Sequence, residues 1–272
     1  HYLSILSYRG FDQFNEPIAP VIAIPTTAGT GSEITPNASF IDTQEKRKMG
    51  INGEAIRPIY AILDPELTLS CPRSATVSAG VDSLVHATEA FVAKKTNPMA
   101  QLFAQEGFNI VMQNLPLLVD QLENINLREK VMYGAFLSAI ALMNSGTGPA
   151  AAMSYPLGVR YGVPHGVGGG IFLPQVIRHN IDNGYLAYAD LLNDRVAGQE
   201  KRDMAESFYT KIIQAWEQLQ VPNQITSFGV TEDKLQSFIS ETMDLKLALD
   251  QNPVPFYEEQ IETTLRHLIS TR

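Results

Sequence analysis

The segment SAGVDSLVHATEAFVAKK, residues 78–95, decides how the fold of this chain is read. Its apolar residues Val81, Leu84 and Val85 recur at the spacing of one helix face. The sequence before this segment is different, since its apolar runs are short and are broken by turn residues. The segment therefore predicts the first helix of a helical region that follows a region of strands.

Helical periodicity continues to the C-terminal end of the chain. Further segments with this pattern cover residues 99–115, 127–145, 201–219 and 232–245. Thr231 precedes two acidic residues, which predicts a helix N-cap there. We therefore expect residues 72–272 to form an all-helical domain.

Residues 1–65 contain three short apolar runs, at 20–25, 37–42 and 60–65, that predict buried strands. Three strands without intervening helices cannot cover both faces of a parallel sheet. We therefore expect residues 1–71 to be the C-terminal part of an α/β domain, whose remainder is a missing N-terminal portion or comes from a partner.

Composition limits the class of protein. The net charge of −9 argues against a general nucleic-acid binder, and the densest basic cluster is only the KRK at 46–48. The single cysteine, Cys71, excludes an internal disulfide and a multi-thiolate zinc site. No signal peptide and no apolar run of about 20 residues is present, so a cytoplasmic protein without a membrane partner is expected.

A turn rich in glycine and threonine follows the first predicted strand, in IPTTAGTGSEITPNASF at 24–40. Glycines let a backbone approach a ligand closely, and threonine hydroxyls can bond a phosphate or a ribose. The turn matches neither a P-loop nor a GxGxxG fingerprint. Ligand binding and a purely structural turn both remain open from these residues alone.

A metal site is suggested by an acidic residue and two histidines. Asp82 and His86 lie four residues apart, so a helix projects both from one face, where carboxylate and imidazole suit Fe²⁺ or Zn²⁺. The alternative is an ordinary hydrogen-bonded Asp–His pair. His165 stands between Pro164 and Gly166, which predicts a histidine held in a fixed turn, as a ligand requires. The following glycines, 168–170, predict close helix packing rather than a phosphate cradle.

Four motifs in this order resemble the iron-containing (group III) alcohol dehydrogenase family. They are PTTAGTGSE at 25–33, LDPEL at 63–67, AGVDSLVHATEAF at 79–91 and YPLGVRYGVPHG at 155–166. The resemblance implies the dehydroquinate synthase-like architecture, with the end of a dinucleotide-binding domain followed by an all-helical metal-binding domain. The family's GGGS-type pyrophosphate loop has no counterpart here, and HYLSILS is expected to begin just after it.

The resemblance also implies which residues bind NAD or NADP. Thr26, Thr27 and Thr30 match positions that contact the dinucleotide. Lys48 matches a basic residue near the nicotinamide ribose, and Asn37 is a weaker candidate.

The family's metal ligands are one aspartate and three histidines, and three of these positions match Asp82, His86 and His165. The position of the remaining histidine is Ala151, and a further histidine near the substrate aligns with Tyr155. Three protein ligands still suffice for a catalytic ion, which needs an open position. Tyr155 is a candidate to donate a hydrogen bond or relay a proton, with a simply buried ring as the alternative.

The resemblance implies a metal-dependent, NAD(P)-linked alcohol dehydrogenase or aldehyde reductase with small alcohols or aldehydes as substrates, acting as a homodimer. The substitution by Ala151 keeps open a catalytically impaired or non-catalytic relative that serves for binding or oligomerisation. A third possibility is another reaction on the same scaffold, as in glycerol dehydrogenase or dehydroquinate synthase, although the spacing of Asp82 and His86 favours the alcohol dehydrogenase branch.

Overall fold

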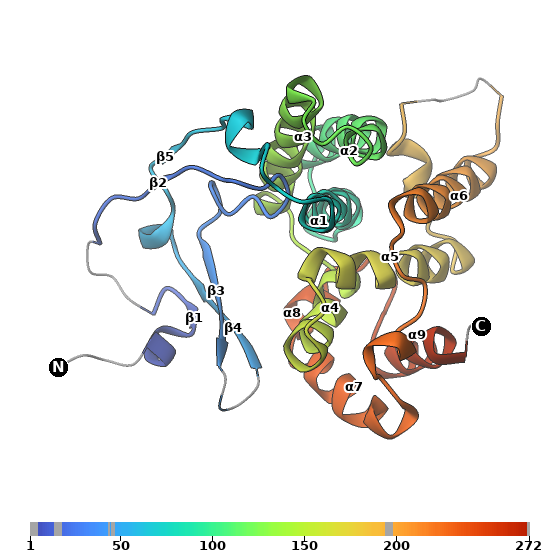
Figure 1. The fold of residues 1–272 in the computed structure, drawn as a ribbon. Helices are drawn as coiled ribbons and strands as arrows, with labels where there is room; N and C mark the ends of the chain where they lie inside the picture. Colours follow the sequence, from blue (N-terminus) through green and yellow to red (C-terminus); the bar gives the residue numbers. More distant parts are fainter. Residues whose placement is uncertain (1–4, 14–17, 43, 45–46, 194–197, 271–272) are drawn as a thin grey trace.

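The computed structural model describes residues 5–13, 18–42, 44, 47–193 and 198–270. Strands occur only near the N-terminal end, and helices make up the rest of the described chain (Figure 1). The predicted order, an α/β segment followed by a helical region, is therefore confirmed.

The N-terminal part contains short strands and single helical turns. Its elements are η1 (Ile5–Tyr8), β1 (Gly10–Phe11), β2 (Ile22–Ala23), β3 (Asn37–Asp42), β4 (Arg47–Asn52), η2 (Glu54–Ile56), β5 (Tyr60–Ala61) and η3 (Pro65–Thr68). One sheet has the order β1-β4-β3, in which β3 and β4 are antiparallel and β1 runs parallel to β4. The other is the parallel pair β2 and β5.

The three predicted strands are in place, but the prediction that they are buried was wrong. Ile22 in β2 is 56% exposed and Tyr60 in β5 is 65% exposed. A parallel pair needs a layer on each face to become buried, and the described residues leave these side chains uncovered. Strand β4 was not predicted because its RKMGIN sequence has two basic residues and a glycine.

The helical part begins at Arg73. Its elements are α1 (Arg73–Val92), α2 (Pro98–Leu118), α3 (Ile125–Met143), α4 (Pro149–Tyr161), α5 (His165–Asp182), η4 (Ala187–Asp190), α6 (Lys201–Leu219), η5 (Thr226–Phe228), η6 (Glu232–Lys234), α7 (Leu235–Met243), α8 (Lys246–Leu249) and α9 (Glu258–Ser270). Side chains of Asn97 and Asn124 cap α2 and α3 by accepting backbone hydrogen bonds. Thr231 stands at the predicted cap position, but its hydroxyl donates to the Asp233 carboxylate instead of accepting from the backbone.

Helix α1 is the centre of the helical part and packs against α2, α3 and α5 (Figure 1). It is buried on nearly every face, from Thr76 to Val92. Gly80 allows the close contact with α2, since a Cβ there would lie 2.5 Å from a methyl carbon of Leu115. Asp82 and His86 therefore lie inside the protein, where polar groups need partners.

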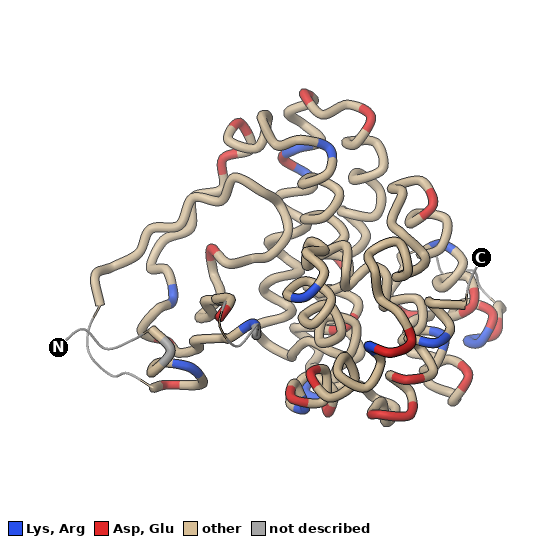
Figure 2. Tube along the Cα trace, turned by 60° about the horizontal axis from the view of Figure 1, so that its bottom comes forward, with Lys and Arg blue, Asp and Glu red and all other residues tan. Residues whose placement is uncertain are grey.

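Acidic and basic residues are scattered along the helical part of the trace in Figure 2, and the described residues form no continuous basic stripe there. Within the described residues, every helix is too short or too polar to cross a membrane.

Candidate functional site

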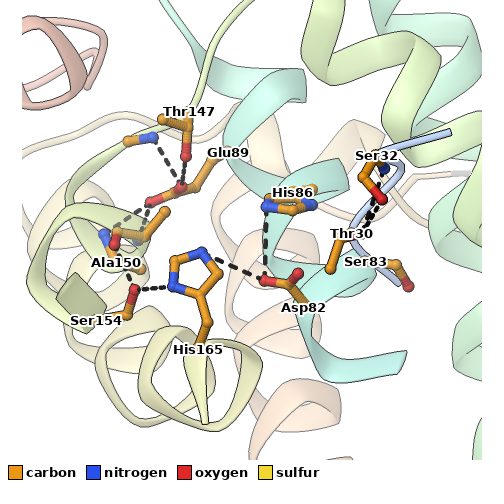
Figure 3. A network of polar contacts seen from close by, with 12 residues as sticks. Thr30, Ser32, Asp82, Ser83, His86, Glu89, Thr147, Ala150, Ser154 and His165 are labelled. Atoms are coloured by element: carbon orange, nitrogen blue, oxygen red, sulfur yellow. Dashed lines mark hydrogen bonds and ion pairs between the residues drawn. The ribbon is translucent and has the colours of Figure 1, made fainter. Parts of the chain in front are cut away.

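Asp82, His86 and His165 come together between α1 and the first residue of α5 (Figure 3). The Asp82 Oδ1 atom lies 3.5 Å from His86 Nε2 and 3.8 Å from His165 Nε2. One ligand atom from each of the three residues falls within 4.8 Å of the others. The structure thus brings together the three residues that the sequence indicated as metal ligands.

These distances fit a shared cation better than direct hydrogen bonds. Both exceed the normal range of about 2.7–3.2 Å for N–H···O bonds. Ligand atoms about 2.1 Å from a tetrahedral ion would stand about 3.4 Å apart, close to the separations observed. On the other side of the ring, His86 Nδ1 is buried and has no hydrogen-bond partner among the described residues. One carboxylate with two imidazoles is a suitable donor set for Fe²⁺ or Zn²⁺.

Gly166 allows α5 to start against α1. A Cβ at this position would lie 1.9 Å from the Ser78 carbonyl oxygen and 2.8 Å from the Asp82 Cβ. His165 is therefore the first residue of a closely packed helix, and the prediction that Pro164 and Gly166 hold it in a fixed turn was wrong. Further along α5, a Cβ on Gly168 would lie 3.0 Å from Ser154 Cβ and one on Gly170 would lie 2.6 Å from Val81 Cγ1. The prediction of close helix packing at 168–170 is confirmed.

His165 is held from its other side by Ser154 of α4. The Ser154 Oγ atom lies 2.6 Å from His165 Nδ1 and 2.6 Å from the Ala151 carbonyl oxygen (Figure 3). Burial lowers the pKa of His165 to about 4, an effect opposed by the Asp82 charge and increased by Lys48 and His86. The imidazole is therefore neutral at neutral pH, as a metal ligand must be.

Glu89 fixes the start of α4, the helix that carries Ser154. Its buried carboxylate accepts hydrogen bonds from the Thr147 hydroxyl at 2.8 Å and from the backbone N–H groups of Gly148 and Ala150 at 2.7 Å (Figure 3). Burial raises the pKa of Glu89, and these donors oppose the shift. A carboxylate at a helix N-terminus is favourably placed, so α1 positions α4 as well as carrying two of the candidate ligands.

A cavity of about 500 Å³ opens beside the three candidate ligands. This volume is within the usual range for small-molecule sites. Its wall is formed by Thr30, Ser32, Thr35, Asn37, Ser39, Lys48, Asp82, His86, Leu142, Thr147, Ala151, Ala152, Tyr155, His165, Leu245 and Ala248. Four predicted residues outside the ligand cluster, Thr30, Asn37, Lys48 and Tyr155, therefore share this cavity with it.

Lys48 of β4 and Tyr155 of α4 meet across the cavity. The Lys48 ammonium lies 4.1 Å from the centre of the Tyr155 ring, a cation–π distance. Burial lowers the pKa of Lys48, against the effect of Asp82. Burial also raises the pKa of Tyr155, and the nearby Ser39 side chain opposes this shift. The Tyr155 hydroxyl thus remains protonated at neutral pH.

Thr26 and Thr27 do not line this cavity. Both are exposed, and Thr27 borders a separate small cavity beside the buried Arg128. The glycines of the same turn approach helices rather than open space. A Cβ on Gly29 would lie 2.3 Å from the Ala79 carbonyl oxygen, and one on Gly31 would lie 2.1 Å from the Ala139 Cβ. The glycines are thus required for packing, while the threonine hydroxyls stay accessible.

Sequence reasoning missed several residues of the site. Glu89 follows Asp82 by seven positions and therefore lies on the same side of α1, a spacing that could have drawn attention to it. Ser154 directly precedes the motif YPLGVRYGVPHG, which begins at Tyr155. Leu245 and Ala248 reach the cavity from the α7–α8 region, and no local pattern in the sequence connects them with it.

Comparison with protein-family models identifies the family of the chain. The model described as "Fe-containing alcohol dehydrogenase family, C-terminal" matches residues 76–269. The chain belongs to the iron-containing alcohol dehydrogenase family. A second model, described as "Iron-containing alcohol dehydrogenase", matches residues 2–65.

Curated relatives of this family member include two bacterial enzymes. The NAD-dependent methanol dehydrogenase of Bacillus methanolicus is 33% identical over 235 residues, covering 85% of this chain and 62% of the relative. The 1,3-propanediol dehydrogenase of Klebsiella pneumoniae is 31% identical over 235 residues, covering 85% of this chain and 61% of the relative. The chain thus spans about three fifths of the length of these relatives.

Solved structures share the fold of this family member. A 1,3-propanediol oxidoreductase superposes with a TM-score of 0.92 at 28% identity, covering 99% of this chain and 71% of that one. A sulfoacetaldehyde reductase from Bifidobacterium kashiwanohense, solved in complex with NAD⁺, gives a TM-score of 0.86 at 27% identity, covering 100% and 71%. The expected group III alcohol dehydrogenase architecture is confirmed.

Proposed function

We propose that this chain belongs to a metal-dependent, nicotinamide-linked alcohol dehydrogenase or aldehyde reductase, of which it binds the metal, the substrate and part of the nucleotide. The observation that supports it most strongly is the cluster of Asp82, His86 and His165 in the wall of a cavity large enough for a small substrate. The names of the relatives, NAD-dependent methanol dehydrogenase and 1,3-propanediol dehydrogenase, favour small alcohols and aldehydes as substrates.

The three clustered residues would hold Fe²⁺ or Zn²⁺. Bound there, the ion would supply Lewis acidity toward the substrate oxygen, with NAD or NADP supplying or accepting the hydride. Asp82 contributes the negative charge of the site, and the two imidazoles contribute neutral donors. The close packing at Gly166 keeps His165 in place without movement of α5.

The cofactor would be bound by Thr26, Thr27, Thr30, Asn37 and Lys48. Hydroxyl and amide groups can bond ribose and phosphate oxygens, and an ammonium adds charge attraction. Three of the five residues line the cavity that contains the metal cluster, which supports placing the nicotinamide end there.

Tyr155 would donate a hydrogen bond to the substrate or pass a proton to it. Its raised pKa keeps the proton on the phenolic oxygen at neutral pH, and the Ser39 side chain lies near it. Ser39 and the solvent in the cavity would then pass a proton between the Tyr155 hydroxyl and bulk water.

We further propose a division into a nucleotide-binding part, residues 1–71, and a metal- and substrate-binding part, residues 72–272. In its support, both sheets lie before residue 72 and the cavity takes residues from each side of this boundary. A homodimer is proposed from the family resemblance, and sedimentation analysis of the purified protein tests it.

The test of this function is NADH- or NADPH-dependent reduction of propanal by the full-length protein after loading with Zn²⁺ or Fe²⁺. We expect His165→Ala to reduce kcat/KM at least 100-fold. His179→Ala serves as the control, because His179 is on the same helix but bonds the Pro255 carbonyl oxygen away from the cluster. Equal activity of both variants and the unchanged protein would overturn the metal assignment.

The second candidate function is that of a non-catalytic relative used for binding or oligomerisation. Ala151, at the position where a fourth ligand is expected, supports it. Titration of the full-length protein with Zn²⁺, Fe²⁺, NADH and NADPH separates the two candidates. Binding of one metal and one nucleotide favours the enzyme, whereas no binding of either kind favours the alternative.

A further inference from the structure

Ser154 has two short contacts that together determine where its hydrogen lies. Its Oγ atom is 2.6 Å from the Ala151 carbonyl oxygen and 2.6 Å from His165 Nδ1. Neither pair of heavy atoms approaches so closely without a hydrogen between them. The carbonyl oxygen can only accept, so the Ser154 hydroxyl hydrogen must point to Ala151.

The contact with His165 then needs a hydrogen from the ring. Because the single hydroxyl hydrogen is already engaged, Nδ1 must carry a proton and donate it to a lone pair of Ser154 Oγ. A neutral imidazole has one N–H, and Nε2 is therefore left with its lone pair. This atom lies 3.8 Å from Asp82 Oδ1 in the candidate metal site.

We propose that Ser154 is a positioning residue that selects the Nδ1–H tautomer of His165 and so keeps Nε2 available as a metal ligand. The part of this proposal that concerns metal binding rests on the proposed function. The part that concerns the tautomer of His165 holds for the metal-free chain. Partners of the second ring nitrogen commonly fix the tautomer of histidine ligands in this way.

The selection matters because Asp82 favours the opposite tautomer. Its carboxylate accepts hydrogen bonds only, so it attracts an N–H on the ring atom that faces it, Nε2 of His165. A proton there would occupy the ligand lone pair and would have to leave before an ion could bind. Ser154 offers an acceptor on the opposite side of the ring, and at 2.6 Å this contact is much closer than the 3.8 Å to Asp82.

Two features keep the serine in place. Ser154 is 1% exposed, so water cannot easily replace its oxygen. Its helix, α4, is fixed at its start by the Glu89 carboxylate and packs against α5 where Gly168 meets the Ser154 Cβ. The oxygen is therefore presented to Nδ1 by two rigid helices.

The experiment compares the metal-free full-length protein with Ser154→Ala. Nitrogen-15 NMR of histidine-labelled protein distinguishes protonated from unprotonated ring nitrogens, and the signals absent from His165→Ala identify His165. We expect Nδ1–H in the unchanged protein and Nε2–H in Ser154→Ala. An Nε2–H signal in the unchanged protein, or the same tautomer in both, would overturn the proposal.

Zn²⁺ affinity, measured by chelator competition, provides the second readout. We expect Ser154→Ala to weaken Zn²⁺ binding about 10- to 100-fold. Ser83→Ala is the matched control, because Ser83 is also buried next to Asp82, and among the described residues its hydroxyl bonds the Gly80 carbonyl oxygen and no ring nitrogen. Equal affinity of Ser154→Ala and Ser83→Ala would contradict the role in metal binding. If the unchanged protein binds no Zn²⁺, the proposed function fails, and the NMR result still decides the tautomer.

Discussion

Replacing Gly166 by alanine should separate His165 from the other two candidate metal ligands without replacing any ligand residue, although the added Cβ would also lie 2.8 Å from the Asp82 Cβ. The added Cβ would lie 1.9 Å from the Ser78 carbonyl oxygen, whereas close carbon–oxygen contacts are about 3.3 Å. The start of α5 must therefore move about 1.4 Å away from α1. Overpacking of this kind lowers the free energy of unfolding by about 1–3 kcal/mol. The higher helix propensity of alanine offsets less than about 1 kcal/mol of this loss.

The shift also carries His165 away from Asp82. Metal–ligand distances tolerate only about 0.2 Å, so Gly166→Ala should weaken Zn²⁺ binding about 100-fold. Chelator competition measures the affinity, and thermal unfolding of the metal-free protein should show a Tm about 5 °C lower. Gly169→Ala is the control on the same helix, since its Cβ would be 3.4 Å from the nearest Val85 methyl carbon. Unchanged affinity and Tm in Gly166→Ala would refute the reasoning.

Three other substitutions test further parts of the arrangement. Ala151→His should supply the missing fourth ligand and tighten Zn²⁺ binding about tenfold or more, and weaker binding in the chelator assay would contradict this. Glu89→Gln should lower the free energy of unfolding in urea by about 2 kcal/mol, because the backbone N–H groups at the start of α4 lose a charged acceptor. An unchanged urea midpoint would show that the Glu89 carboxylate does not stabilise the start of α4. Gly29→Ala should lower the Tm, since its Cβ would be 2.3 Å from the Ala79 carbonyl oxygen. A Tm equal to that of the unchanged protein would show that the turn accommodates a side chain at this position.

Several helices could be predicted because their apolar periodicity is a local property, whereas α4 and α5 lie outside the predicted segments. The predicted segment 201–219 coincides with α6, and α1 covers most of the segment 78–95. Helix α1 still differs from a simple amphipathic helix, because neighbours bury almost all of its faces. Its polar residues Asp82 and His86 are for this reason part of an interior site rather than a surface pair.

The positions of three strands could be predicted from the sequence, but whether other elements cover them could not. Apolar runs such as PVIAIP indicate strands that become buried when other layers cover them, and β2 has no such cover among the described residues. Strand β4 has a polar sequence and is stabilised by pairing with β3, a contact between segments that no window of sequence contains.

The candidate ligands could be predicted because their spacing on α1 and the family motif both point to them. The residues that position them could not, since their roles depend on contacts between helices. Ser154 acts through His165 of the next helix, and Glu89 acts through backbone groups about sixty positions away. Such contacts become visible only in three dimensions.

The most direct test of the metal site is anomalous X-ray diffraction from crystals of the protein grown or soaked with Zn²⁺, with data collected at the zinc edge. We predict one strong anomalous peak within bonding distance of an Asp82 carboxylate oxygen, His86 Nε2 and His165 Nε2. No peak at this position in crystals that contain zinc elsewhere would contradict the metal assignment.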